Sequence, residues 1–89
     1  MSLINDPDER FNCSLLNLQA GRKAKASTAY ASAMQHFQAA LNLLATDSWE
    51  NKYRHTMDIY CERADVAYLL GRFAEAEADF DEAMAHATD

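Results

Sequence analysis

The stretch that decides the fold is Phe73–Ala87, FAEAEADFDEAMAHA, in which aromatic and small residues recur at helical spacing. Spacings of three and four residues place five of its side chains on one stripe of a helix: Phe73, Ala76, Phe80, Ala83 and Ala87. Aromatic rings fill the gap to a neighbouring helix, and alanines allow close approach. The stretch therefore predicts a helix that packs against other helices along one face.

An earlier segment, Tyr30–Leu44, YASAMQHFQAALNLL, repeats this order at a constant offset of 43 residues. The matching positions are Tyr30, Ala33, Phe37, Ala40 and Leu44. The same offset relates Gly21 to Ala64, two small residues near the middle of the helix before each stripe. A large side chain there would hold two paired helices apart, so the repeated unit is a whole helical hairpin.

Apolar periodicity and breaker residues predict four helices. The first runs from about Phe11 or Ser14 to Ala26, and the second follows Ser27 or Thr28 as N-cap and continues to about Ala45. The third follows a cap at Asp47 or Ser48, with Glu50 in capping-box position, and runs to about Leu70. Gly71 then precedes the last helix. We divide the chain into a leader and short N-terminal segment (1–13), a first hairpin (14–47) and a second, longer hairpin (48–89).

Composition supports this interpretation. The 89 residues are 49% hydrophobic and 25% charged, with two Gly and one Pro, which is typical of one compact unit of packed helices. No apolar run approaches the roughly 20 residues that cross a bilayer, and the N-terminus lacks a signal-peptide pattern. We expect a cytoplasmic protein with no membrane partner and with reduced thiols at Cys13 and Cys61. The opening Met1-Ser2-Leu3 reads as a leader joined to a piece of a larger protein.

Charge is unevenly distributed along the chain. Residues 1–56 carry six Lys or Arg against five Asp or Glu, a net of +1, whereas residues 57–89 carry two Arg against nine carboxylates, a net of −7. The acidic half argues against a nucleic-acid partner, whose phosphates it would repel. A solvated helix face is the simpler interpretation, and an acidic docking surface for a basic partner is the alternative.

These features resemble the tetratricopeptide repeat, which has a small residue in helix A, a turn, and then aromatic, Ala, aromatic and Ala along helix B. The second hairpin matches with Ala64, Gly71, Phe73, Ala76, Phe80 and Ala83. The first matches less closely, since Thr28 stands at the usual Gly turn position. The offset of 43 exceeds the usual repeat of about 34, so residues 45–56 lengthen the connection, and we expect Trp49 and Tyr53 to pack it against the first hairpin.

This resemblance implies an all-α fold of antiparallel helical hairpins, a fragment of a right-handed superhelix. An antiparallel four-helix bundle remains the alternative fold, since its seam shows similar stripes.

A second resemblance concerns the string NLQAGRKAKASTAY at 17–30, together with Trp49, Tyr53 and Glu62-Arg63-Ala64. These residues resemble the start of the helical repeat region in large bacterial signalling kinases. Such proteins combine a kinase-like domain, a predicted signal-transduction ATPase, a sensory domain and a histidine kinase. The resemblance implies a regulatory packing or partner-sensing role in signal transduction.

Residues for chemistry are sparse, and we predict neither an enzyme nor a cofactor. The only glycines, Gly21 and Gly71, lie too far apart for a phosphate-binding loop, and no cysteine or histidine spacing is typical of a nucleophile or a metal site. The histidines at 36, 55 and 86 lack the flanking residues of a phosphoacceptor, so we interpret them as exposed or partly packed helix residues. A histidine phosphotransfer or dimerisation domain is the less favoured alternative.

The tetratricopeptide resemblance implies an interaction groove lined by the first helix of each hairpin. Its candidate residues are Leu15, Leu18, Arg22, Lys25, Asp58, Glu62, Asp65 and Tyr68. Arg22 and Lys25 are expected to face Glu62 and Asp65 across the hairpins. Leu18 and Arg22 stand where a carboxylate clamp would need Lys and Asn, so an acidic C-terminal peptide is not the expected ligand.

Two hairpins are fewer than the roughly three that usually bury a solenoid core. We therefore predict a scaffold segment that stacks on neighbouring repeats, on other domains, or on its own copy as a homodimer. A peptide-binding adaptor that uses the groove is the alternative. No small-molecule substrate is expected.

Overall fold

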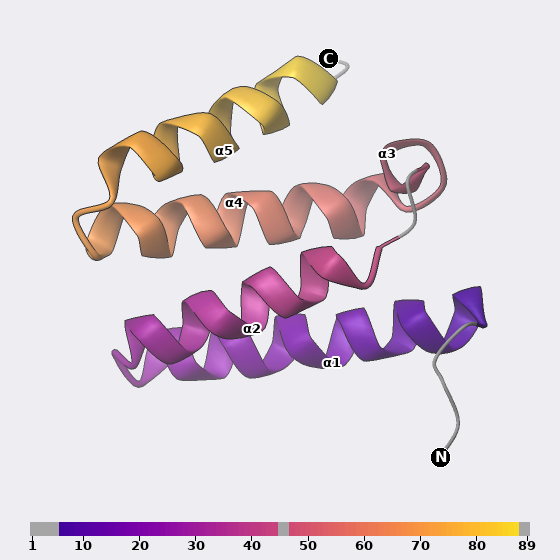
Figure 1. The fold of residues 1–89 in the computed structure, drawn as a ribbon, viewed down its shortest axis with the longest axis horizontal. Coiled ribbons are helices and arrows are strands. Elements are labelled where there is room, and N and C mark those ends of the chain that lie inside the picture. Colours follow the sequence, from indigo (N-terminus) through magenta and orange to yellow (C-terminus); the bar gives the residue numbers. More distant parts are fainter. Residues whose placement is uncertain (1–5, 45–46, 88–89) are drawn as a thin grey trace.

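The computed structural model describes residues 6–44 and 47–87, which form helices and no strands (Figure 1). In chain order the helices are α1 (Pro7–Ala26), α2 (Tyr30–Asn42), α3 (Ser48–Asn51), α4 (Tyr53–Leu69) and α5 (Phe73–His86). The predicted all-α class, with antiparallel helical hairpins, is confirmed. The hairpins are α1 with α2 and α4 with α5.

The first helix begins earlier than predicted. The Asp6 side chain accepts a hydrogen bond from the Asp8 backbone N–H at 3.1 Å, and Pro7 and the acidic pair Asp8 and Glu9 fill the first turn. These are strong helix-start signals, which the expectation of a start at Phe11 or Ser14 overlooked. Part of the segment 1–13 assigned to a leader is thus helical from Pro7 onward.

The predicted third helix is interrupted near its start. Lys52, with φ −132° and ψ 49°, separates the single turn of α3 from α4. The expected capping box at Asp47 does not form, because its carboxylate accepts a hydrogen bond from the Asn51 side chain at 2.6 Å instead. Likewise α2 follows Ala29, without a side-chain cap from Ser27 or Thr28. The expected end of that helix at Ala45 lies outside the described residues.

The 43-residue repeat extends to the backbone of the two hairpin turns. Thr28 (φ 62°) and Gly71 (φ 80°) both adopt the left-handed conformation, and they are 43 residues apart. After each, the same bond closes the turn: the Ala29 N–H donates to the Ala24 carbonyl, and the Arg72 N–H to the Ala67 carbonyl, both at 2.8 Å. The two hairpins therefore turn in the same way at equivalent positions.

The helices stack in chain order, with α1 on α2, α2 on α4, and α4 on α5. Figure 1 shows α1 and α5 at opposite edges of the molecule, which measures 37 × 32 × 17 Å. This flat stack is closer to two hairpins laid side by side than to a closed four-helix bundle, in which the first and last helices pack together.

The core lies between the two hairpins and within the first. Its buried members are Leu18, Ala33, Phe37, Ala40, Ile59 and Val66. A Cβ atom at Gly21 would lie 2.4 Å from Cε1 of the fully buried Phe37 ring, so only glycine lets α1 approach α2 this closely. Ala64, the equivalent of Gly21, is also fully buried, and the prediction that both positions must be small is confirmed.

Candidate functional site

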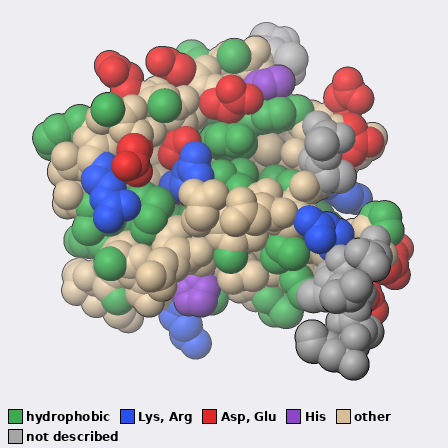
Figure 2. Space-filling view, viewed as in Figure 1, with side chains coloured by type: hydrophobic (Ala, Val, Ile, Leu, Met, Phe, Trp, Pro, Cys, Tyr) green, Lys and Arg blue, Asp and Glu red, His purple; other side chains and the backbone are tan. Residues whose placement is uncertain are grey.

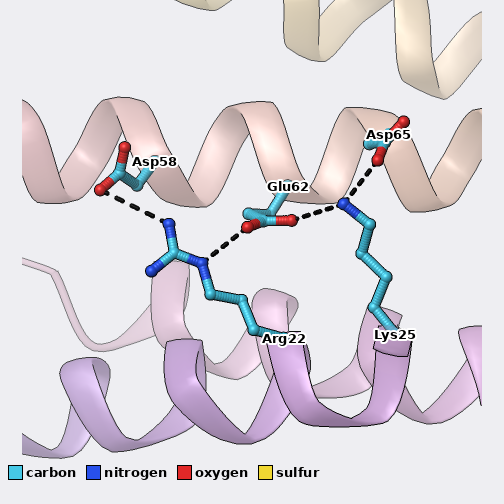
Figure 3. A network of polar contacts seen from close by, with 5 residues as sticks. All are labelled: Arg22, Lys25, Asp58, Glu62 and Asp65. Atoms are coloured by element: carbon cyan, nitrogen blue, oxygen red, sulfur yellow. Dashed lines mark hydrogen bonds and ion pairs between the residues drawn. The ribbon is translucent and has the colours of Figure 1, made fainter. Parts of the chain in front are cut away.

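Five charged residues of the predicted groove form one network between α1 and α4 (Figure 3). Glu62 lies between the two cations, 2.6 Å from Arg22 Nε and 2.8 Å from Lys25 Nζ. Arg22 also approaches Asp58 at 3.6 Å, and Lys25 approaches Asp65 at 2.5 Å. The predicted pairing of Arg22 and Lys25 with Glu62 and Asp65 is therefore present, and a fourth acidic contact is added.

The network favours the charged forms of Glu62 and Lys25. Burial raises the pKa of Glu62, but hydrogen bonds from Lys25 and Arg22 outweigh that effect, and the net shift is downward from 4.5. Burial lowers the pKa of Lys25, but its bonds to Asp65 and Glu62 leave the net pKa above 10.5. A peptide carboxylate that sought these cations would have to displace three carboxylates already in place.

The apolar candidates do not form one open surface with this network. Leu18 is only 4% exposed and belongs to the core, so its predicted place in the groove is wrong: it packs inward, toward α2. Leu15 is half-buried. Tyr68 is 61% exposed, and its ring makes an edge contact with Phe73 of α5 at 5.1 Å between centroids.

A second ion pair, which sequence reasoning missed, ties three helices together. Arg63 of α4 donates to both carboxylate oxygens of Asp79 on α5, through Nε at 2.8 Å and Nη2 at 2.5 Å. Its Nη1 donates to the Gln38 side chain of α2 at 2.5 Å. The hydrogen bond to Asp79 raises the pKa of Arg63, and the Asp79 side chain is 6% exposed. The available sequence signal was a carboxylate three residues after Ala76 and four before Ala83, the two buried alanines of the last helix.

Ser14 and His55 form a buried pair between α1 and α4. The Ser14 hydroxyl donates to the Ala40 carbonyl at 2.8 Å, so it accepts from His55 Nε2, also at 2.8 Å. Burial lowers the pKa of His55, and the Phe11 ring packs edge-on against it at 5.0 Å. A serine beside a histidine resembles a nucleophile and its base, but this hydroxyl is fully buried and already donates to the backbone, so its role is structural.

The other histidines are also partly packed. His36 Nδ1 lies 3.3 Å from the Asn17 side-chain oxygen. His86 stacks on Trp49 at 4.2 Å between ring centroids, with Glu82 3.1 Å from Nε2. The predicted partly packed state thus holds for these two, whereas His55 is more deeply buried than predicted.

Trp49 packs differently from the prediction. Its ring stacks on Tyr60 of α4 at 5.4 Å and on His86 of α5, and it lies 5.8 Å from Tyr53. The aromatic contacts therefore anchor the connection to the second hairpin, where the prediction placed it against the first.

The α5 stripe was predicted from its spacing to pack against other helices, and this holds for Ala76 and Ala83, which are buried, but is wrong for its aromatic residues. Phe73, Phe80 and Met84 are 59%, 45% and 72% exposed. Their equivalents 43 residues earlier, Tyr30, Phe37 and Leu41, belong to the core cluster or pack against it. The repeat itself was the signal, because α4 lies against α2, whereas no described helix covers the equivalent stripe of α5.

The described part of the chain contains neither a metal-binding cluster nor a membrane-spanning helix. Among residues 6–44 and 47–87, no three His, Cys, Asp or Glu side chains gather so as to hold a metal ion. In the same part of the chain, no helix combines the length and apolar character needed to span a membrane.

Stacked helical hairpins joined by polar contacts define a small all-helical module, and comparison with known proteins finds a similar segment in a signalling protein. The chain is 36% identical over 96 residues to hybrid signal transduction histidine kinase G of Dictyostelium discoideum. The alignment covers 98% of this chain and 3% of that protein, so the chain is similar to a small segment of a very long kinase. The predicted bacterial setting stays a prediction, since this relative is an amoebal protein.

No family model matches the chain. No solved structure matches it either.

Proposed function

We propose that this chain is a non-catalytic assembly module of a multidomain signalling histidine kinase, and that it packs other helices of the same protein or of a partner protein against α5. Similarity over nearly its whole length to a segment of a histidine kinase supports the signalling context. The described side chains favour packing over chemistry, because the buried polar groups all have hydrogen-bond partners within the protein.

One observation carries the proposal: the aromatic stripe of α5 is a copy of the stripe that α2 buries. Phe37 is fully buried, whereas Phe80, its equivalent, is 45% exposed. Neighbouring apolar side chains that stand exposed together are typical of an interaction surface. The surface of α5 fits a helix, because the equivalent Phe37 of α2 is buried among residues of two helices, α1 and α4.

The tetratricopeptide likeness is part of this proposal. The turns at Thr28 and Gly71, and the small residues at Gly21 and Ala64, support it, and the interval of 43 makes the repeat a lengthened one. In such arrays each repeat contacts its neighbours, and the array gains stability as units stack. The proposed partners are therefore helical protein segments, with no cofactor, nucleic acid or membrane required.

A tandem chain tests the proposal. A second copy of residues 46–89 is joined after residue 88, which keeps the period of 43. The tandem chain is made in two versions. One is unchanged, and the other has Lys in place of Glu62 and Asp65 in the appended copy only. The proposal predicts that α5 amides become better protected from hydrogen exchange in at least one version. Phe80→Gln in the original α5 should abolish that protection.

Leu16→Gln is the matched control, because Leu16 is an exposed apolar residue of α1 at the opposite edge. It should leave the protection of α5 unchanged. Unprotected α5 amides in both versions of the tandem chain would contradict the assembly function.

A further inference from the structure

The face of α5 differs from its equivalent on α2 in charge. In α2 the stripe is continuous and apolar, with Met34 packed against the core. The residue 43 positions later is Glu77, and the equivalent of Gln38 is Asp81. Both carboxylates are exposed and lie one helical turn apart. The surface left open on α5 is thus an aromatic ridge bordered by acids.

The acids of α5 outnumber the cations that contact them. α5 carries five carboxylates and no Lys or Arg. Asp79 pairs with Arg63, Glu82 contacts His86, and Glu75 lies 3.9 Å from Arg72. In Figure 2 acidic side chains lie along α5, at the top of the view, among apolar ones.

The packing of α4 on α2 shows what kind of helix fits such a stripe. α4 contributes Ile59 and Val66 to the core, and Leu70, directly after α4, packs against that core. Arg63 of α4 donates to Gln38 of α2 at 2.5 Å. An arginine 43 positions after Arg63 would meet Asp81, which carries a carboxylate where the equivalent Gln38 carries an amide. A charged acceptor forms a stronger hydrogen bond with a guanidinium than a neutral one does.

We propose that α5 binds an amphipathic helix with a ridge of branched aliphatic residues and a basic flank, whose Arg or Lys side chains pair with Asp81 and Glu77. This inference rests on the proposed function and names the chemistry of its partner. The aliphatic residues of the partner helix cover Phe73, Phe80 and Met84 of α5. The basic flank of the partner helix determines which partner binds and in which register.

A second copy of this chain does not fit that description. The outward positions of α1 that correspond to Ile59, Val66 and Leu70 are Leu16, Lys23 and Ser27. Two of these three are polar, so α1 has the character of a capped edge. Two α5 faces brought together would oppose their carboxylates, which disfavours a symmetric dimer as well.

The partner must also differ from α4 on its other flank. The residues 43 positions beyond Arg22 and Lys25 are Asp65 and Tyr68. If the partner helix carried acids at the positions equivalent to Glu62 and Asp65, those acids would face Asp65 and Tyr68 of α4. Neither of these two residues is a cation, whereas α1 offers Arg22 and Lys25 to α4. The tandem version with Lys at these two places removes this mismatch, and it is the version expected to protect α5 better.

A charge reversal in that Lys version of the tandem chain tests the inference. Asp81→Lys in the original α5 should reduce the protection of α5 amides by about tenfold, because it places a lysine beside Arg63 of the appended copy. Asp81 is exposed, so this change leaves the Arg63–Asp79 pairs in place. Sedimentation of the 89-residue chain should show a monomer.

The outcomes separate the two proposals. Equal protection of α5 with and without Asp81→Lys would overturn the basic-partner inference and leave the assembly function standing. A dimer of the 89-residue chain that Phe80→Gln dissociates would also overturn it, since the occupant would be a second copy. Absence of protection in every version, with no effect of Phe80→Gln, would overturn both.

Discussion

His55 is the residue whose titration the structure constrains most clearly. Burial holds the pKa of His55 in the folded chain below 6.5, the value for the unfolded chain. Between these two pKa values the unfolded chain binds a proton that the folded chain does not. Its contribution to stability is therefore complete above about pH 6.5 and is lost as the pH falls toward the folded pKa. Asp58 acts to raise this pKa, and Arg22 and Lys52 act to lower it.

We predict that the free energy of unfolding decreases from pH 7.5 to 5.5, with a slope from this group no steeper than about 1.4 kcal/mol per pH unit. His55→Gln can still donate to Ser14 but does not titrate, so its stability should change less over the same interval. Urea denaturation followed by circular dichroism measures both. Identical pH profiles for the two proteins would rule out this role of His55.

Between helices, the Arg63–Asp79 pair is a largely buried ion pair that joins α5 to α4. Asp79→Ala leaves a largely buried guanidinium with only Gln38 as a described hydrogen-bond acceptor, so we expect a loss of about 2–3 kcal/mol in the free energy of unfolding. The matched control is Glu75→Ala on the same helix, where the ion pair is exposed and the loss should stay within about 0.5 kcal/mol.

Replacing both partners, by Arg63→Met with Asp79→Leu, should recover most of the lost stability, because apolar residues of similar size leave no uncompensated charge. Urea denaturation of the four proteins gives the comparison. If Asp79→Ala were no more harmful than Glu75→Ala, the pair would not hold α5 in place.

For the molecule as a whole, sequence reasoning succeeded where the signal was local or repeated. The stripe of Phe37 and its copy at Phe80 follow from spacing, and the meeting of Arg22 with Glu62 follows from aligning the two hairpins. The break at Lys52 has no such signal in helical periodicity. The contacts of Ser14 with His55, 41 residues apart, depend on how far α4 rotates about its axis, which no spacing rule fixes.

Leu18 was misplaced because the tetratricopeptide resemblance assigned it to the groove by its position in the hairpin. That position does not fix how far α1 turns about its own axis. The close approach of α1 to α2 at Gly21 settles that orientation, since the face around Gly21 must turn toward Phe37.

The central claim is that α5 repeats α2 but that none of the described helices covers its stripe. Phe37→Ala and Phe80→Ala make the same change at equivalent positions, so urea denaturation of these two variants tests the claim most directly. We predict a loss of about 3–5 kcal/mol for the fully buried Phe37 and less than half of that for Phe80. Equal losses at the two positions would show that α5 is already covered, and would contradict the account.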